Sequence, residues 1–313
     1  MQNALDYDIL IVGGGAAGLS AAIYVVRYNL STLVVSSDFG GQILETGDIE
    51  NWPGIKRITG PELSRAFEDH AKELGAKLVQ GFVKGIKKVE GGFSVSIDSL
   101  ELQSVFVKAV VLSAGAKHRR LGIKGEKELS GRGISYCATC DGPFCKDKVI
   151  AMVGGGDAAL TGAVDLTAHA THVYLIHRRG EFRAKPAYVE AARKNPKIEF
   201  IFDTNIIEAK GKNLLEGVVL DKPYKGSNEL AIQGLFVEIG FLPETSLVKD
   251  LGVEFDEQGY IKVGADQSTS VPGVFAAGDV TNASNRFAQL VTAASEGAIA
   301  AEGAFRYIQN VNR

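Results

Sequence analysis

Two cysteines separated by two residues are the strongest candidates for redox chemistry in this sequence. Cys137 and Cys140 enclose Ala138 and Thr139, and Asp141 follows directly. One thiol of such a pair can stabilise the thiolate of the other, which favours reversible disulfide formation. Asp141 could donate or accept the proton that disulfide exchange requires, or it could cap a helix. The spacing predicts a redox-active pair with an adjacent acid.

A zinc site is the alternative interpretation of these cysteines. Cys145 lies nearby in the sequence and His118 is available, but there is no second C-x-x-C, so we expect no metal. Cys145 is more typical of a buried free thiol than of a catalytic one. An odd number of cysteines, 3 in 313 residues, argues against a secreted fold held together by disulfides.

A glycine-rich segment near the start of the chain has the spacing of a dinucleotide-binding turn. Gly13, Gly15 and Gly18 follow the apolar run 9–12 and open an Ala-rich segment with helical periodicity. The first glycine allows the tight turn, the second lets the backbone approach a pyrophosphate, and the third lets helix and strand pack closely. The helix N-terminus would then face the phosphates.

The same pattern occurs a second time. Gly154, Gly156 and Ala159 follow the apolar run 149–153 and precede a helical segment at 158–168. A strand, a glycine turn and a helix form the first half of a βαβ unit. Two such units predict an α/β protein with two Rossmann-like domains.

The strands that complete the two units end differently. The first, 33–35, ends at Ser36 and Ser37, where an acid that binds a ribose is usual. The second, 173–176, is followed by basic residues that would pair with a 2′-phosphate, namely His177, Arg178, Arg179 and Arg183. The basic segment predicts NADPH rather than NADH, although a solvated basic turn is the alternative.

A Gly–Asp pair after a short apolar strand is a candidate flavin contact. Gly278 and Asp279 follow Val274 and Phe275 and precede a long helical segment, 288–308. A carboxylate there could accept hydrogen bonds from ribityl hydroxyls, and flavins commonly take electrons from nicotinamide cofactors. An ordinary turn is the alternative for the Gly–Asp pair alone.

Composition excludes several classes of partner. The formal net charge is −3 and the pI is near 6.0, so the chain has no basic excess for nucleic acid or an anionic membrane. No apolar run approaches the roughly 20 residues of a membrane span. The first ten residues contain Asp6 and Asp8 and no basic residue, so we expect no signal peptide and a cytoplasmic protein.

Taken together, the motifs resemble those of the low-molecular-weight thioredoxin reductases, flavoproteins of the pyridine nucleotide-disulphide oxidoreductase superfamily. The resemblance extends along most of the chain in the order that the family has. It is carried by Gly13 to Gly18, Gly40-Gly41-Gln42, Glu50 to Gly54, Cys137 to Gly142, Gly154 to Ala159, His177-Arg178-Arg179 with Phe182-Arg183-Ala184, and Gly273 to Asp279.

The resemblance implies two Rossmann-like three-layer domains, the second inserted into the first. Residues 1–117 and 247–313 would bind FAD, and residues 118–246 would bind NADPH and carry the cysteine pair. Electrons would pass from NADPH to FAD, to Cys137–Cys140 and then to the disulfide of thioredoxin through a mixed disulfide. Cys140 would lie nearer the flavin, while the sulfur that attacks the partner stays open. The family is homodimeric.

The resemblance also assigns cofactor contacts. The expected FAD residues are Gly13, Gly15, Ala17, Gly18, Ser36, Gly41, Gln42, Asn51, Val83, Gly115, Gly278, Asp279, Ala288 and Gln289. The expected NADPH residues are Gly154, Gly156, Asp157, Ala158, Ala159, His177, Arg178, Arg179 and Arg183. Two positions depart from the family: Ala288 precedes Gln289 where a basic residue is common, and Ala158 replaces a residue that bears a hydroxyl.

Other functions fit the same motifs. The electrons could serve another disulfide client or oxygen, as in a dithiol oxidase, or the chain could be a redox sensor without turnover. In the implied arrangement the nicotinamide and the cysteine pair both lie on the inserted domain and both need the flavin. We therefore expect a hinge rotation at the connections near 116–119 and 241–247.

Overall fold

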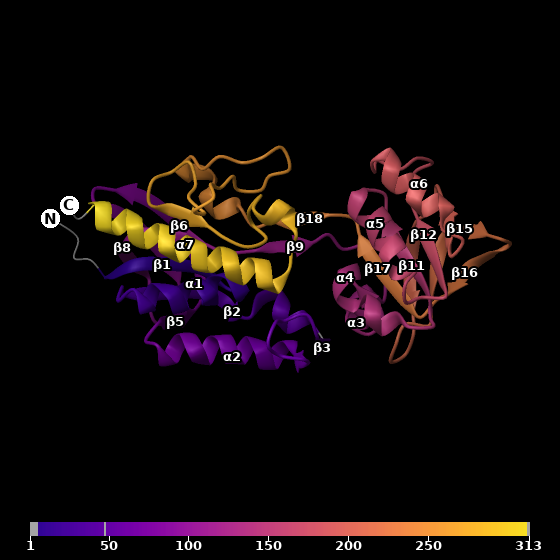
Figure 1. The fold of residues 1–313 in the computed structure, drawn as a ribbon, viewed down its shortest axis with the longest axis horizontal. Helices are drawn as coiled ribbons and strands as arrows, with labels where there is room; N and C mark the ends of the chain where they lie inside the picture. The colour runs from indigo at the N-terminus through magenta and orange to yellow at the C-terminus, as the bar shows by residue number, and fades with distance from the viewer. Residues whose placement is uncertain (1–5, 47, 312–313) are drawn as a thin grey trace. The chain divides into compact units, whose positions relative to one another are not determined.

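The computed structural model describes residues 6–46 and 48–311, which form two compact units (Figure 1). The first unit contains the described residues up to Lys117 and those from Leu242 onward, and the second contains His118–Phe241. The second unit thus interrupts the sequence of the first, and the chain returns at 241/242 rather than at 246/247. The expected α/β class is confirmed. Residues 1–5, on which part of the signal-peptide expectation rests, lie outside the described residues.

The first unit is built around a seven-stranded sheet of order β5-β2-β1-β8-β7-β6, with β19 also paired to β8. The pairs among β5, β2, β1, β8 and β19 are parallel, whereas β6, β7 and β8 form an antiparallel meander. The strands are β1 (Tyr7–Gly14), β2 (Thr32–Phe39), β5 (Lys77–Gln80), β6 (Phe82–Val89), β7 (Gly92–Asp98), β8 (Ser104–Leu112) and β19 (Val274–Ala276).

Both faces of β1 are buried, which explains its continuous apolar run. Ile9 and Ile11 pack with the helices on one face, and Leu10 and Val12 belong to the core on the other face. Figure 1 shows α7 running beside α1 along this sheet. The helices of the unit are α1 (Ala16–Arg27), α2 (Gly60–Glu73) and α7 (Leu290–Val311).

The parallel strands of this unit end at one edge of the sheet. Val12 aligns with Val35 on one side and with Leu112 on the other, and Leu112 aligns with Ala276. The segments that follow these strands therefore meet at the carboxyl edge, where open α/β sheets bind ligands. Shorter elements of the unit are η1 (Gly41–Glu45), β3 (Asp48–Ile49), β4 (Ile58–Thr59), η3 (Ser246–Leu251) and η4 (Ser284–Arg286).

The second unit has a five-stranded parallel sheet of order β10-β17-β11-β12-β13. A three-stranded antiparallel sheet, β14-β15-β16, packs on one face, and α5 and α6 cover the other. The strands are β10 (Ile134–Ser135), β11 (Val149–Gly154), β12 (His172–Ile176), β13 (Ile198–Ile201), β14 (Ile206–Lys210), β15 (Gly217–Tyr224), β16 (Ser227–Ala231) and β17 (Gly234–Glu238). The helices are α3 (Glu126–Leu129), α4 (Ala138–Asp141), η2 (Gly142–Cys145), α5 (Asp157–Leu166) and α6 (Pro186–Lys194).

Alternating side chains of β11 fill the two cores of this unit. Ile150 and Met152 pack with Leu160 and Ala163 of α5, whereas Ala151 faces the antiparallel sheet. This period of two is that of a strand buried on both faces. The result is a three-layer arrangement that fixes the start of α5 at the carboxyl end of β11.

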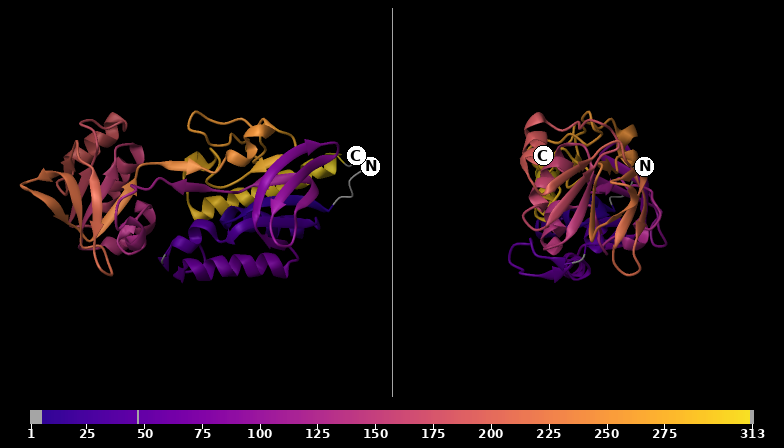
Figure 2. Two further views of the ribbon diagram at one scale, coloured as in Figure 1. Left: turned by 180° about the vertical axis from the view of Figure 1, so that it is seen from behind. Right: turned by 90° about the vertical axis from the view of Figure 1, so that its right-hand side faces the viewer.

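Two short strands connect the units at the positions where connections were expected. They are β9 (Ala116–His118) and β18 (Phe241–Pro243), which pair with each other. The strands run side by side in Figure 1 and in the reversed view of Figure 2. Within the described residues, no helix is both long and apolar enough to cross a membrane.

Candidate functional site

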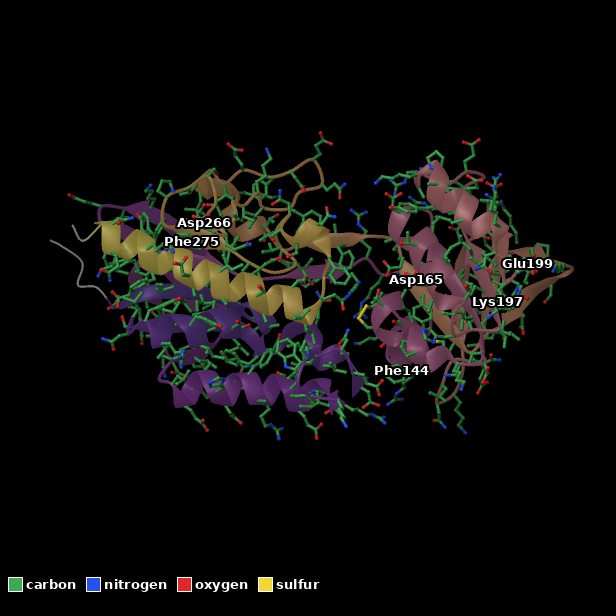
Figure 3. The ribbon with its side chains drawn as sticks, in the orientation of Figure 1. Phe144, Asp165, Lys197, Glu199, Asp266 and Phe275 are labelled. Carbon is green, nitrogen blue, oxygen red and sulfur yellow. A yellow bond between two sulfur atoms is a disulfide. The ribbon has the colours of Figure 1, made fainter. Side chains whose placement is uncertain are left out.

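The two cysteines form a disulfide in a tight turn, residues 137–140, which we call the cysteine turn. Cys137 precedes α4, its Cα lies 5.3 Å from that of Cys140, and the bond is visible in yellow in Figure 3. The Cys140 amide donates to Cys137 Sγ at 3.2 Å, and the Cys137 amide donates to Ser135 Oγ at 3.1 Å. A sulfur at a helix start that accepts an amide hydrogen bond is suited to carry negative charge.

Asp141, the last residue of α4, is partly buried beside the cysteine turn. Burial raises its pKa, and a hydrogen bond with Ser135 partly offsets the rise. The carboxyl group therefore keeps its proton to a higher pH than an exposed aspartate does. Such a group is suited to deliver a proton to a sulfur when the disulfide opens.

Cys145 takes no part in the disulfide. It is a free, buried cysteine whose thiol pKa is raised, mainly by burial. Within residues 6–46 and 48–311, no three His, Cys, Asp or Glu side chains are grouped to hold a metal ion. A buried thiol with a raised pKa is inert toward disulfide exchange, so Cys145 serves packing.

The glycines of the second fingerprint have different surroundings. A Cβ on Gly154 would overlap the Glu238 carbonyl oxygen and the Ala159 methyl group, because strand and helix meet closely there. A Cβ on Gly156 would have no heavy atom within 4 Å. The open space at the start of α5 is a cradle of the kind that a pyrophosphate fills. This part of the chain fits a dinucleotide.

The segment 177–185, here called the basic loop, folds back onto this fingerprint. The Arg183 amide donates to the Gly155 carbonyl at 2.8 Å, and the Lys185 amide donates to Asp157 Oδ1 at 2.8 Å. His177 is 7% exposed, lies against Gly155, and its Nε2 has no hydrogen-bond partner. Its pKa is lowered by burial first and then by Arg179, Arg178 and Arg183.

The basic loop therefore gathers the arginines that the sequence singled out. All three guanidinium groups act electrostatically on one buried imidazole, so they share one region at the carboxyl end of β12. A concentration of positive charge beside an open phosphate cradle fits an extra phosphate on the ribose.

The first fingerprint has the same division of roles. Gly13 has a φ of +108°, and a Cβ there would overlap the Ser113 carbonyl oxygen. A Cβ on Gly18 would overlap the Gly13 carbonyl oxygen, which shows how closely α1 packs on β1. For Gly15 the nearest atom to such a Cβ is the Gly40 oxygen at 3.8 Å. The open position lies at the start of α1, as a bound pyrophosphate requires.

Ser36, which replaces the usual acid at the end of β2, supports the turn itself. Its Oγ accepts a hydrogen bond from the Gly14 amide at 2.9 Å. Asp38, two residues further on, accepts from the Gly41 amide at 2.7 Å. Side chains in the last half of β2 thus hold backbone segments of the first fingerprint and of η1 in place.

Asp279 lies at the same edge of the sheet and is partly buried. Gln42 Nε2 donates to Asp279 Oδ2 at 3.3 Å and to the Ala116 carbonyl at 2.7 Å. Burial, followed by the nearby Glu296 carboxylate, raises the pKa of Asp279 to about 6. Glu296 itself accepts from the Gly278 amide at 2.7 Å. The first unit thus presents a partly buried carboxylate beside a phosphate cradle, which fits a flavin dinucleotide.

Comparison with known proteins identifies the family of this chain. The family model described as pyridine nucleotide-disulphide oxidoreductase matches residues 7–297. The chain belongs to the pyridine nucleotide-disulphide oxidoreductase family. A thioredoxin reductase of Bacillus subtilis (strain 168) is 40% identical over 314 residues, covering 99% of this chain and 98% of that protein.

Solved structures agree with this assignment. The crystal structure of thioredoxin reductase from Streptococcus pyogenes MGAS5005 has a TM-score of 0.89 and 37% identity, covering 97% of this chain and 98% of that one. Thioredoxin reductase from Giardia duodenalis also gives 0.89, with 38% identity over 97% of this chain and 99% of the other. The resemblance stated from the motifs is confirmed.

Several of the flavin contacts expected from the family come together in the first unit. Asn51 Nδ2 donates to Gln289 Oε1 at 3.2 Å, so two residues far apart in the sequence meet. Ala17 packs against Gly278, and Gly115 has no atom within 4 Å of the place of a Cβ. Val83 lies near the start of β6 and packs against the core of the unit. As flavin contacts, all of these stay predictions.

Two acidic residues near these sites were missed by sequence reasoning, Glu238 and Glu296. Glu238 ends the otherwise apolar strand β17, and Glu296 lies within the Ala-rich helix α7. An acid within an apolar element was the available signal, because such a group needs a buried partner. The buried Glu296 side chain accepts a hydrogen bond from the Gly278 amide and so fixes the backbone beside Asp279 in the first unit.

Replacing Gly156 by alanine is expected to weaken NADPH binding at least about tenfold without destabilising the fold. The residue has a φ of −98° and open space around the position of a Cβ, so alanine fits the chain but occupies the cradle. Isothermal titration calorimetry with NADP⁺ and thermal unfolding measure the two quantities.

Gly154→Ala is the matched control. Its methyl group would overlap Glu238 and Ala159, so this variant should lose stability by about 2 kcal/mol or more. If Gly156→Ala bound NADP⁺ like the wild type, the open space would not be the pyrophosphate site.

Proposed function

We propose that this chain is an NADPH-dependent flavoprotein that reduces the disulfide of thioredoxin. The observation that carries the proposal is the Cys137–Cys140 disulfide on a unit that also holds a dinucleotide cradle with a basic loop. The similarity to thioredoxin reductases along nearly the whole chain supports the same activity. Family membership implies a flavin and a nicotinamide nucleotide as cofactors, and we assign FAD and NADPH.

Each cofactor has a proposed place. The carboxyl edge of the first sheet, with Gly15, Gln42 and Asp279, would hold FAD. The cradle at Gly156 and the arginines of the basic loop would hold NADPH. When bound, these groups supply the two electrons that open the disulfide.

Residues of the chain would carry out the proton transfer and the thiol–disulfide exchange. Asp141 holds a proton that it delivers to a sulfur of the cysteine turn as the S–S bond breaks. A thiolate of the pair, stabilised at the start of α4, attacks the partner's disulfide and forms a mixed disulfide, which the second sulfur resolves. Thr139 and Phe144, which is labelled in Figure 3, are exposed on this segment and leave it open to a protein partner.

Turnover with candidate acceptors tests the assignment. We expect kcat/KM for thioredoxin to exceed that for a small disulfide such as cystine at least about 100-fold, because a protein partner adds binding energy away from the sulfurs. NADPH oxidation is measured as the decrease in NADPH absorbance. Equal rates with oxygen alone would indicate a dithiol oxidase, and no turnover with any disulfide would indicate a redox sensor.

Replacement of Asp141 by asparagine is expected to lower kcat/KM for thioredoxin at least about tenfold at pH 6. The raised pKa favours the protonated carboxyl group of the wild type on the acidic side, and asparagine has no acidic proton to give. The wild-type rate should fall as the pH rises through that pKa, so the difference between the two proteins should shrink. Profiles of kcat/KM against pH measure this.

Asp165→Asn, on the exposed side of α5 and labelled in Figure 3, is the control and should behave like the wild type. An Asp141→Asn deficit of the same size at every pH would contradict a proton-transfer role.

We also assign the chain to the cytoplasm and to a homodimer, as the family resemblance implies. Tyr24 on α1 and Val291 and Ile299 on α7 are exposed apolar side chains, of the kind that association covers. Sedimentation should give twice the 33.3 kDa of one chain.

A further inference from the structure

Asp157 holds the end of the basic loop against the start of α5. It is the first residue of that helix and directly follows Gly156 of the nucleotide cradle. Its Oδ1 accepts a hydrogen bond from the Lys185 amide at 2.8 Å, and its Oδ2 lies 3.6 Å from the Lys185 ammonium group. Both oxygens of the carboxylate thus interact with one residue, and we call the Asp157–Lys185 pair the loop clasp.

The loop clasp is one of two anchors on either side of Arg183. The other anchor is Phe182, whose ring centroid lies 5.4 Å from that of Phe200 and 4.8 Å from that of Phe202. Between the anchors, the Arg183 amide donates to the Gly155 carbonyl at 2.8 Å. The backbone of Arg183 is therefore fixed at the second fingerprint, while the residue itself is exposed. An exposed guanidinium group on a fixed backbone is available to an anionic ligand.

A carboxylate beside a phosphate cradle needs an explanation. The start of a helix attracts anions, and Asp157 places an anion in the first turn of α5. This charge would repel a bound pyrophosphate unless a cation neutralised it. The Lys185 ammonium group supplies the opposite charge. The contacts of Asp157 therefore assign it to the loop that it holds rather than to the nucleotide.

We propose that Asp157 is a positioning residue for nucleotide choice: the loop clasp holds Arg183 where its guanidinium group pairs with the 2′-phosphate of NADPH. This inference rests on the proposed function, and it gives Asp157 a different role from the direct contact expected from the family. A loop that is already held in its binding conformation loses less entropy when the ligand binds. NADH has no 2′-phosphate, so an ordered Arg183 adds nothing to its binding. The loop clasp therefore increases the affinity for NADPH alone.

Nucleotide binding by variants of the loop clasp tests the proposal. The Kd values for NADP⁺ and NAD⁺ are measured by isothermal titration calorimetry on the FAD-loaded full chain. Asp157→Ala removes both contacts with Lys185, and we expect it to weaken NADP⁺ binding about tenfold and NAD⁺ binding less than about threefold. Asp157→Asn keeps an acceptor for the Lys185 amide, so both of its Kd values should stay within about threefold of the wild type.

A double-variant cycle shows whether Asp157 acts through Arg183. In a chain that carries Arg183→Ala, adding Asp157→Ala should change the Kd for NADP⁺ less than about twofold, because the two residues contribute to one interaction. Glu190→Ala, at an exposed glutamate of α6, is the matched control and should change neither Kd. Effects of the two variants that multiply, or equal losses of NADP⁺ and NAD⁺ binding in Asp157→Ala, would overturn the proposal.

Trypsin digestion reports on the loop clasp without any nucleotide. The bond between Arg183 and the buried Ala184 lies between the two anchors, so the wild type should be cut there slowly. The next basic residue, Lys185, precedes Pro186, and trypsin does not cut before proline. Asp157→Ala should speed cleavage after Arg183 at least about fivefold, and Asp157→Asn should not.

The two measurements separate this inference from the proposed function. Unchanged cleavage in Asp157→Ala, with a wild type that prefers NADP⁺, would overturn the role of Asp157 and leave the NADPH assignment in place. A wild type that bound NADP⁺ and NAD⁺ equally would refute the NADPH assignment, and the inference about nucleotide choice with it.

Discussion

Serine at Cys137 or Cys140 is expected to lower thioredoxin-directed turnover at least about 1,000-fold. A hydroxyl group cannot form the disulfide that stores the electron pair, and the cysteine turn offers no substitute sulfur, because Cys145 is buried and free. NADPH should still reduce the flavin in either variant, since the proposed cofactor sites use other residues. Steady-state assays with thioredoxin measure the loss.

Anaerobic titration distinguishes loss of the sulfur pair from loss of the fold. The wild type should accept about two electron pairs per chain, and the serine variants about one, because the disulfide is a two-electron couple. Cys145→Ser is the matched control and should keep both capacities. Substantial thioredoxin reduction by Cys137→Ser would mean that electrons reach the partner by another route.

Local patterns in the sequence determine most of the architecture. The run 9–12 became the middle of β1, the segment 158–168 became α5, and the segment 288–308 became α7. Parallel strands that are buried on both faces appear in the sequence as continuous apolar runs, and glycine turns mark where each strand is followed by a helix. These signals lie within a few residues of one another, so they can be recognised without knowing the fold.

Interactions between distant segments could not be recognised in this way. Ser36 accepts a hydrogen bond from the Gly14 amide, and Gln42 donates one to Asp279, which is far away in the sequence. Neither pair produces a local sequence pattern. The same holds for Glu296, which accepts a hydrogen bond from the Gly278 amide. Such polar groups are explained only by the buried partner that the fold supplies.

The antiparallel layer of the second unit was missed for a different reason. Strands β14, β15 and β16 place few residues in the core, and much of β15 and β16 is exposed. A short strand with one solvent-exposed face and several charged residues resembles a loop in composition. Its role is to cover the face of the parallel sheet opposite α5, which only the packing of Val218, Leu220 and Leu230 reveals.

Alanine at both Arg178 and Arg179 is expected to lower kcat/KM for NADPH about 100-fold and that for NADH less than about threefold. The two guanidinium groups are exposed, so each contributes less binding free energy than a buried ion pair would. Both lie close enough to His177 to lower its pKa. NADH lacks the 2′-phosphate, so removing the arginines removes no such contact from it. Paired kinetic assays with the two nucleotides measure the discrimination.

The size of the difference between nucleotides is the decisive quantity. A general loss of positive charge would weaken the binding of both cofactors together, because both carry the pyrophosphate that we propose to lie at the start of α5. Arg193→Ala, an exposed arginine on α6 in the same unit, controls for that and should change neither value. An equal loss for NADPH and NADH in the double variant would show that the basic loop is a solvated surface, and the preference for NADPH would then need another source.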